Sequence, residues 1–435
     1  MHSLCDLHFR SVVRHGGNGE AYRSINLKRP RRALGAVYNF TQPPHVDVRA
    51  FRGSCRGKNL ACVTNSNADV GKGMPHIVVV GGGIAGLACA EVLAPHVKVT
   101  MVDAGRRVGG RLGAIEPFDC RYSFDHGAQY LSHDGGAFGE FLEDCEKAGA
   151  VAKWAPITSL GKISNDEEGI LIMDSLVRNS TSKTVYVGTP CMASAPGHLL
   201  ARMKDSLEEL WENTTCTGLT RKADSAKWQL ELRVRDGGHY WYKLLDADLV
   251  ITALGHAQTN TLLRLVAPKF VAPAAEVTSN VCWVLMAAFE DPLGLAFNGV
   301  LLEEPNNSGI AWIANNSSKP GRPEGAECWV VHASPEWSNA RASLKAGDVA
   351  SELLALFLRC VGMEGKQAVH AKAFKWGNAY PLNPAVPASG EAFYFDKDLG
   401  LGACGDWTRG PRVGDAFQSG LEMGQCALKS LGVAS

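Results

Sequence analysis

The sequence predicts an α/β fold in which a Rossmann-type dinucleotide-binding domain carries an inserted α+β substrate domain with a mainly antiparallel sheet. Three features predict this architecture. An apolar strand at residues 76–80 leads into a glycine-rich turn and a helix, and a second apolar strand at 247–255 has the composition of a neighbour in the same parallel sheet. Apolar and aromatic stretches at 282–290 and 327–334 are typical of antiparallel strands that cover a ligand pocket.

The glycine-rich turn is the strongest motif of the chain. Gly81, Gly83 and Gly86 stand at the G-x-G-x-x-G spacing between the strand and the helix. The first glycine permits a sharp turn, the second lets the backbone approach a pyrophosphate, and the third lets the helix pack against the strand. The helix N-terminus, starting with Ile84 and Ala85, then offers free N–H groups to the phosphates.

An acidic residue marks the end of the next strand. Asp103, followed by Ala104, lies 17 residues after Gly86, where the carboxylate that binds an adenosine ribose belongs. A strand before the turn, a helix after it and this acid together predict dinucleotide binding. An ordinary glycine-rich turn between strand and helix is the alternative, and the motif alone leaves NAD and FAD open.

Composition narrows the class of protein. The 435 residues are 46% apolar, which is ordinary for a globular protein with room for two domains. The longest apolar tract, residues 77–93, is interrupted by glycines and Glu91, so no membrane span is predicted. The 13 cysteines are scattered without metal-ligand spacing, so we expect reduced thiols and no metal site.

The first 74 residues differ from the rest in charge. They hold 12 Lys and Arg against four acidic residues, although the whole chain balances 44 against 44. Such a basic extension is typical of an organelle transit segment that is removed on import, with the chloroplast favoured over the mitochondrion. A disordered basic tail, or a start placed upstream of a domain that begins near Met74, is the alternative. No aromatic residues alternate with the basic ones, so no nucleic-acid partner is predicted.

Two further loops combine glycine with charge. The VGGRLG stretch after Asp103 places Arg111 where a guanidinium can reach the pyrophosphate from the side opposite the helix. Near the C-terminus, GLGACGDW is followed by a Gly-Pro turn instead of a helix, so we reject it as a second nucleotide motif. It predicts a strand that ends at Gly405 and Asp406, and a last helix that begins near Asp415.

The middle of the chain alternates between helical and strand patterns. A helix is predicted at residues 198–211, and strands at 228–234 and 239–245 are joined as a hairpin through 236–238. After this region, the apolar strand at 247–255 returns to the parallel sheet. The dinucleotide-binding domain is therefore predicted to be discontinuous. The predicted boundaries are 1–74 for the extension, 75–140 with 246–274 and 381–435 for the dinucleotide-binding domain, and 141–245 with 275–380 for the substrate domain.

Catalytic residues are only weakly marked. Residues 275–380 are rich in tryptophan, and Trp312 and Trp376 are candidates for substrate contact, although each is more often a core residue. His332 and His370 are the titratable candidates in this region, but a lone histidine in a strand is usually structural. We therefore assign no catalytic residue and keep His332, Trp312 and Trp376 as weak candidates.

Several separate motifs occur in the order typical of one family. They are the glycine turn, VGGRLG, FDHGAQY, YVGTP, WIANNSSKPGR, WVVHASPEWS, ACGDW and RVGDAFQSG. Over roughly residues 75–435 the chain therefore resembles the renalase-like branch of the flavin-dependent amine oxidase superfamily. The resemblance implies one noncovalently bound FAD, and it implies as FAD-binding residues Gly81, Gly83, Ile84, Ala85, Gly86, Asp103, Ala104, Arg111, Gly127, Ala128, Gln129, Gly405, Asp406, Ala416 and Phe417.

The resemblance also implies a role for each part of the site. The glycine turn would cradle the pyrophosphate, Asp103 would bind the adenosine ribose, and Arg111 would cover the phosphates. Residues 127–129 would line the flavin, Asp406 would hold the ribityl or pyrophosphate region, and residues 416–417 would lie near the isoalloxazine. Two positions depart from the family pattern: Asp103 stands where Glu is common, and residues 414–415 are Gly-Asp in place of Glu-Gly.

The implied activity is that of a FAD-dependent oxidoreductase or oxidase. A small organic donor would pass a hydride to flavin N5, and dioxygen would reoxidise the flavin and yield hydrogen peroxide. The donor is either a misreduced nicotinamide dinucleotide or an amine, because pocket aromatics suit both. A pigment-pathway desaturase or amine oxidase, which needs a longer or more apolar pocket, and a non-catalytic flavin-binding redox sensor are the alternatives.

Overall fold

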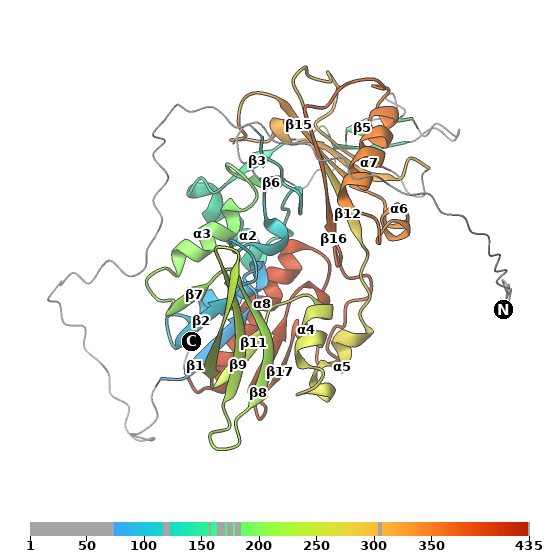
Figure 1. Ribbon diagram of the computed structural model, residues 1–435. Coiled ribbons are helices and arrows are strands. Elements are labelled where there is room, and N and C mark those ends of the chain that lie inside the picture. The colour runs from blue at the N-terminus through green and yellow to red at the C-terminus, as the bar shows by residue number, and fades with distance from the viewer. Residues whose placement is uncertain are drawn as a thin grey trace, which may run out of the picture. The chain divides into compact units, whose positions relative to one another are not determined.

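The computed structural model describes residues 74–433 with the exception of 116–121, 156–157, 163–169, 172–176, 179–183 and 303–306 (Figure 1). The predicted basic extension lies outside these residues apart from Met74, so its role in targeting stays a prediction. No helix in the described part of the chain is long and apolar enough to cross a membrane.

A six-stranded sheet forms the centre of the dinucleotide-binding part. Its order is β17 (Phe393–Asp396), β18 (Leu401–Cys404), β11 (Leu249–Thr252), β1 (His76–Val80), β2 (Lys98–Val102) and β7 (Glu209–Trp211). All neighbours are parallel except β17, which runs antiparallel to β18. The return of β11 to the side of β1 confirms the parallel pairing predicted for residues 247–255.

This sheet is covered on both faces, as the continuous apolar composition of its strands requires. The covering elements are helices α1 (Ile84–Leu93) and α8 (Val413–Ser430) on one face, and strands β8 (Thr214–Arg221), β9 (Trp228–Asp236) and β10 (His239–Ala247) on the other. Ile77 and Val79 point to the helices, whereas Val78 and Val80 point to the three-stranded sheet. The alternation of side chains along β1 thus builds two separate cores.

Helices α1 and α8 lie in close contact because glycine removes the side chain where they cross. A Cβ atom on Gly420 of α8 would lie 1.9 Å from the carbonyl oxygen of Ala85 in α1. One turn later, a Cβ atom on Gly424 would lie 2.9 Å from the carbonyl oxygen of Cys89. The C-terminal helix therefore packs directly onto the helix that begins at the glycine turn.

A second, seven-stranded sheet carries the aromatic region. Its order is β16 (His370–Trp376), β12 (Cys282–Phe289), β15 (Glu327–Ala333), β14 (Ile310–Asn315), β13 (Gly299–Leu302), β4 (Thr158–Gly161) and β5 (Val177–Arg178). Only β13 and β4 are parallel, which confirms the mainly antiparallel sheet that the sequence predicts. Helix α7 (Ala346–Cys360) packs on one face through Leu353 and Phe357, and Phe124 packs on the other.

The remaining helices and strands are short. They are α2 (Gly136–Lys147), α3 (Ser194–Arg202), α4 (His256–Leu263), α5 (Pro268–Glu276), α6 (Pro335–Ala340), β3 (Val151–Trp154) and β6 (Val185–Gly188). Strands β3 and β6 pair as a two-stranded sheet. Figure 1 shows α3 and α2 close to the parallel sheet, and α7 and α6 beside the antiparallel one.

Two local predictions can be compared with these elements. The hairpin predicted through residues 236–238 is confirmed, because β9 and β10 pair across it. The predicted helix at 198–211 is wrong in its second half: α3 ends at Arg202, and residues 209–211 form β7. Pairing of the β7 backbone with β2 outweighs the local helical pattern. Strand β7 and the hairpin, which the predicted boundaries place in the substrate domain, lie on the parallel sheet. The domain boundaries as a whole stay a prediction.

We expect Gly420→Ala to destabilise the protein by about 2–4 kcal/mol, because the new methyl group meets backbone that cannot move aside without separating α1 from α8. Gly197→Ala in α3 is the matched control: nothing lies within 4 Å of its Cβ position. Alanine at position 197 should raise the free energy of unfolding by about 0.5–1 kcal/mol. Urea denaturation of both variants measures the difference, and equal stabilities would contradict the close packing of the two helices.

Candidate functional site

The carboxyl ends of β1, β2, β11 and β18 border one large cavity. Its volume is about 690 Å³, within the range of about 300–1,000 Å³ that small-molecule and cofactor sites span. Ligands of open parallel sheets bind at this edge. Residues of β12, β15 and β16 line the same cavity, so both large sheets contribute to its wall.

The glycine turn has the geometry that a pyrophosphate cradle needs. Gly81 has a φ of +115°, and a Cβ atom there would lie 2.5 Å from the carbonyl oxygen of Ala253. A Cβ atom on Gly86 would lie 1.9 Å from the carbonyl oxygen of Gly81, so only glycine lets α1 pack this close to β1. Nothing lies within 4 Å of the Cβ position of Gly83, which lines the cavity. The start of α1 is therefore open to a ligand.

Asp103 lies just after β2 with its carboxylate held by two backbone amides. The N–H of Gly82 donates to Oδ2 at 2.6 Å, and the N–H of Gly105 donates to Oδ1 at 2.7 Å. Each carboxylate oxygen keeps further acceptor capacity, and Asp103 lines the cavity. The carboxylate therefore presents acceptor oxygens to a ligand in the cavity.

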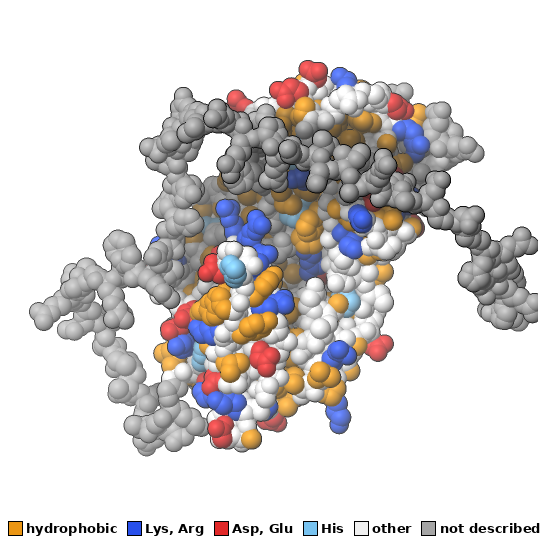
Figure 2. Space-filling view, in the orientation of Figure 1, with side chains coloured by type: hydrophobic (Ala, Val, Ile, Leu, Met, Phe, Trp, Pro, Cys, Tyr) orange, Lys and Arg blue, Asp and Glu red, His pale blue; other side chains and the backbone are white. Residues whose placement is uncertain are grey.

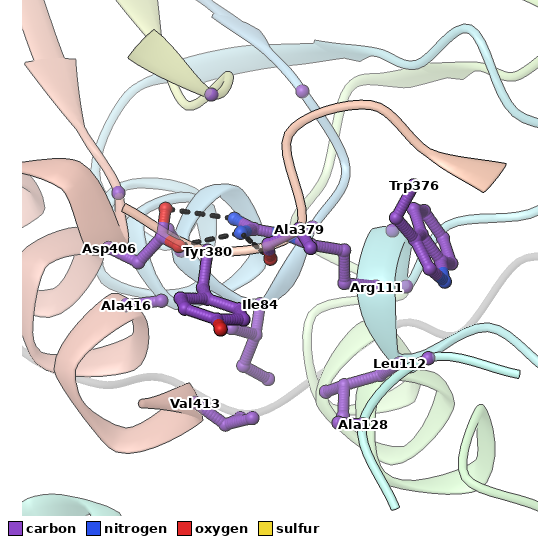
Figure 3. A pocket seen from close by; sticks show the side chains of 18 of the residues that line it. Ile84, Arg111, Leu112, Ala128, Trp376, Ala379, Tyr380, Asp406, Val413 and Ala416 are labelled. Carbon is purple, nitrogen blue, oxygen red and sulfur yellow. Dashed lines mark hydrogen bonds and ion pairs between the residues drawn. The ribbon is translucent and has the colours of Figure 1, made fainter. Parts of the chain in front are cut away.

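Arg111 and Asp406 form a bidentate ion pair in the cavity wall (Figure 3). Nη1 and Nη2 of Arg111 donate to the two carboxylate oxygens at 2.6 and 2.8 Å, and Nη1 also donates to the carbonyl oxygen of Ala379 at 3.0 Å. The side chain of Asp406 is 3% exposed and that of Arg111 is 37% exposed. The loops that follow β2, β16 and β18 thus meet at one guanidinium.

The FDHGAQY segment forms a further part of the wall. The N–H of Ala128 donates to the carbonyl oxygen of Arg111 at 2.9 Å, and a Cβ atom on Gly127 would lie 2.0 Å from the same oxygen. Gly127 and Ala128 line the cavity. The buried Gln129 does not, because its amide group donates to the carbonyl oxygens of Asp125 and Gly127.

A buried ionic cluster holds this segment from behind. Oδ2 of Asp125 accepts from Nζ of Lys319 at 2.9 Å and from Nη2 of Arg322 at 2.5 Å, and the three side chains are at most 1% exposed. Burial acts to raise the pKa of Asp125, but the two cations outweigh it, so that the pKa is lowered. Burial lowers the pKa of Lys319 to about 8. Two cations against one carboxylate leave an excess of positive charge here.

Two neutral imidazoles lie near the cluster. Burial lowers the pKa of His332 to about 3, helped by the charge of Lys319, and burial lowers the pKa of His126 to about 4. Nε2 of His332 and Nδ1 of His126 are buried without a hydrogen-bond partner among the described residues. The ring of His126 stacks on Trp376 with centroids 5.1 Å apart. His332 and Trp376 both line the cavity.

Two further candidates, Trp312 and His370, do not line the cavity. Trp312 pairs with His332 across β14 and β15, is 7% exposed, and its ring centroid lies 5.7 Å from that of Tyr130. His370 stacks on Phe124 with centroids 5.6 Å apart. Of the weak catalytic candidates, His332 and Trp376 therefore face the cavity and Trp312 does not.

Most of the predicted FAD-binding residues line this single cavity. They are Gly81, Gly83, Ile84, Ala85, Asp103, Ala104, Arg111, Gly127, Ala128, Gly405, Asp406 and Ala416. Gly86 lies beneath the turn, Gln129 points away, and Phe417 packs on Phe141 with ring centroids 5.1 Å apart. The three exceptions follow lining residues directly, and neighbouring side chains point in different directions. Contacts of any of these residues with a ligand stay a prediction.

Other parts of the wall were not predicted. Residues 253–255 and Gln258 line the cavity and follow β11. Only the strand order could have indicated them, because they lie at the carboxyl end of a parallel strand next to β1. Cys282 and Tyr380 have no local signal that separates them from core residues. Among the described residues, no group of three or more His, Cys, Asp or Glu side chains is arranged to hold a metal ion.

Comparison with known sequences covers a limited part of the chain. Residues 79–145 match a family model described as an NAD(P)-binding Rossmann-like domain. A stretch of 100 residues is 37% identical to an L-amino-acid oxidase of Siganus canaliculatus, and it covers 20% of this chain and 19% of that protein. The chain therefore matches about a fifth of the curated relative's length.

Comparison with solved structures covers most of the chain. Cyclohexylamine oxidase from Brevibacterium oxydans IH-35A is similar with a TM-score of 0.61 at 10% identity, over 83% of this chain and 100% of that one. An oxidoreductase from Methanosarcina mazei is similar with a TM-score of 0.55 at 14% identity, over 81% and 100%. The protein is thus a mixed α/β protein with a Rossmann-type dinucleotide-binding domain, and it shares this fold with oxidases.

The low pKa of His332 predicts a loss of stability in mild acid. The unfolded chain binds a proton at this histidine below about pH 6.5. The folded chain leaves it neutral down to about pH 3. Its contribution to the free energy of unfolding therefore falls by about 1.4 kcal/mol per pH unit as the pH drops through this window.

Substitution of His332 by Gln removes this dependence. Between about pH 6 and pH 4.5, the His332→Gln variant should lose about 2 kcal/mol less stability than the wild type. Urea denaturation at the two pH values measures both losses. Equal losses in the two proteins would contradict a strongly lowered pKa for His332.

Proposed function

We propose that the protein is a FAD-dependent oxidoreductase that binds both FAD and its electron donor in the cavity. One observation supports this most strongly. A single cavity is bordered by the glycine turn and Asp103, which suit the adenosine and pyrophosphate of a dinucleotide, and also by His332 and Trp376 on the antiparallel sheet. The cavity therefore extends from the glycine turn to the antiparallel sheet. The fold shared with amine oxidases supports the same class.

The residues present fit FAD. The space over Gly83 is one that a Cβ atom would partly fill, and the N-cap of α1 has no side-chain bond, so its first N–H groups are available to phosphate oxygens. Gly405 has a φ of +144° and brings the backbone close to the cavity beside Asp406. We infer that these groups hold FAD noncovalently, with Asp103 on the ribose and residues 127–128 beside the isoalloxazine.

FAD held by these residues would supply the redox chemistry, namely acceptance of a hydride from the donor and reoxidation by dioxygen to hydrogen peroxide. The chain's own task is to orient both molecules. Trp376 and Tyr380 both present aromatic rings to the cavity (Figure 3). His332 is neutral near pH 7, so its imidazole lines the cavity without adding charge.

The charges of the cavity favour a neutral donor group over an amine. Among the described lining residues, the carboxylates are Asp103, which we assign to the ribose, and Asp406, which Arg111 engages. An ammonium group would meet neutral side chains and the excess positive charge around Lys319. A dihydronicotinamide ring, which is planar and uncharged, fits better. An amine oxidase, which the fold of cyclohexylamine oxidase favours, is the second candidate.

Anaerobic reduction tests the class of donor. The purified full-length chain should be yellow, should release FAD when it is denatured, and should lose its flavin absorbance faster with isomers of dihydronicotinamide dinucleotide than with amines. Reduction by amines alone would support the amine oxidase instead, and reduction by neither would support the redox sensor. A colourless protein that takes up no FAD would contradict the central proposal.

Arg111→Lys tests the FAD site. A lysine cannot keep the bidentate contact with Asp406, so the loops at both positions lose their common anchor. We expect the Kd for FAD to rise by about tenfold, which corresponds to about 1.4 kcal/mol. Arg409→Lys is the matched control, since Arg409 is absent from the cavity wall. Fluorescence titration of the apoproteins measures both, and an unchanged Kd in the Arg111 variant would place FAD elsewhere.

A further inference from the structure

The outer strand of the three-stranded sheet exposes large apolar side chains. Strand β10 is the edge strand, since the order of the sheet is β10-β9-β8. Tyr240, Trp241, Tyr242 and Leu244 are 59%, 42%, 71% and 60% exposed. Figure 2 shows hydrophobic side chains gathered over this part of the molecule, with basic side chains around them. Adjacent exposed side chains of this size mark an interaction surface.

The backbone of β10 is available for pairing at the same residues. The turn glycines, 237–238, have φ values of +52° and +89°, as a type I′ turn requires, so the hairpin closes with a hydrogen-bonded pair at His239. Such pairs recur at every second residue, and the backbone groups of Tyr240, Tyr242 and Leu244 therefore point to the outer edge. No described strand pairs with that edge.

The outer edge of β10 lacks the features that usually prevent another strand from pairing with an edge strand. The pairing of β9 with β10 continues over nine residues without a bulge, and the strand contains no proline. Its one lysine, Lys243, is turned to the opposite face, where Nζ lies 3.9 Å from the ring centroid of Trp211. A long, regular and apolar edge of this kind is suited to pair with another strand.

We propose that β10 pairs with β10 of a second copy of this chain, in an antiparallel dimer whose two-fold axis passes beside Tyr242. The axis can lie at any residue of β10, because a residue opposite itself forms either a hydrogen-bonded or a non-hydrogen-bonded pair. Centring on Lys243 would place two ammonium groups opposite each other, and centring on Trp241 would pair only residues 239–243. Centring on Tyr242 pairs residues 239–245 of both copies and places Tyr240 opposite Leu244 of the second copy. Centring on Tyr240 would pair only residues 239–241 of the strand. Centring on Leu244 would place Tyr242 opposite an aspartate, Asp246.

The charges of β9 and β10 fit this register. Trp241 comes to lie opposite Lys243 of the second copy, which gives two ammonium–aromatic contacts across the seam. Tyr240 is paired with Arg235 on β9, and Leu244 is paired with Glu231. The two outer rows on this face therefore begin with an arginine in one copy and end with a glutamate in the other, whereas the central row begins and ends with Arg233. An anionic membrane would meet Glu231 beside Arg233 and Arg235 on this face, but it offers no backbone groups to the open edge of β10, so a second copy is the better partner.

The proposed contact is small. It pairs seven residues from each copy and covers three large exposed side chains on one face. We therefore expect a weak, reversible dimer with a Kd on the order of micromolar. Neither FAD nor a donor is needed for it. The dimer can therefore be tested independently of the enzymatic proposal.

Sedimentation equilibrium of the full-length chain tests the dimer. The wild type should dimerise as its concentration rises, and Tyr242→Lys should raise the Kd by about tenfold or more because it places two ammonium groups opposite each other. Leu265→Lys, at a residue that is 84% exposed between α4 and α5, is the matched control and should leave the Kd unchanged. A wild type that stays monomeric at its highest soluble concentration, or that instead binds anionic vesicles as a monomer, overturns the proposal.

Disulfide crosslinking tests the register even if Tyr242→Lys fails to fold. Under mild oxidation, Tyr242→Cys should give covalent dimers, because position 242 faces itself across the seam. Tyr240→Cys alone should not, but it should crosslink to Leu244→Cys when the two variants are mixed. The wild type, which has its own cysteines, gives the background. Dimers whose crosslinking does not differ between positions 240 and 242 would overturn the proposed register.

Discussion

The ion pair between Arg111 and Asp406 is the interaction on which the cavity depends. The two residues are 295 positions apart, and the guanidinium also bonds the carbonyl oxygen of Ala379 beyond β16. The carbonyl oxygen of Arg111 in turn accepts from the N–H of Ala128. One residue thus joins four segments of the wall. Because the carboxylate of Asp406 is almost fully buried, loss of its partner would leave an uncompensated charge at a cost of about 3–5 kcal/mol.

The buried cluster of Asp125, Lys319 and Arg322 fixes a further part of the cavity wall. Besides the carboxylate, Arg322 bonds the carbonyl oxygen of Gly188, and Asp125 accepts from the N–H of Met192, so the cluster fixes the FDHGAQY segment against two other loops. It also leaves one positive charge unbalanced at low dielectric. That charge disfavours protonation of His332, and it favours any negative charge that develops in the cavity. The cluster therefore positions this part of the cavity wall and makes the electrostatic potential near it more positive.

Sequence patterns predict the parts of this protein whose signals are local. The turn at 81–86 requires glycine for steric reasons that hold wherever a strand runs into a packed helix, and the hairpin requires glycine at 237–238, so both are confirmed. The helix predicted for 198–211 is wrong because residues 209–211 gain their hydrogen bonds from β2. The contact of Arg111 with Asp406 could not be predicted from either loop, since it depends on how distant strands are ordered in the sheet. Gln129 and Phe417 show a finer limit: motif spacing locates a segment, but backbone geometry decides which neighbour faces the cavity.

The two ends of the cavity differ in what specifies them. At the end bordered by the glycine turn, the proposed binding of a nucleotide uses backbone amides, the absence of side chains and the carboxylate of Asp103. At the other end, recognition depends on which side chains project from β12, β15 and β16, and these strands tolerate many residues with the same fold. Shared architecture with oxidases therefore carries information about the first end only. The neutral His332, the aromatic ring of Trp376 and the lack of a free carboxylate among the described lining residues are features of this chain itself, and they are what favours an uncharged donor.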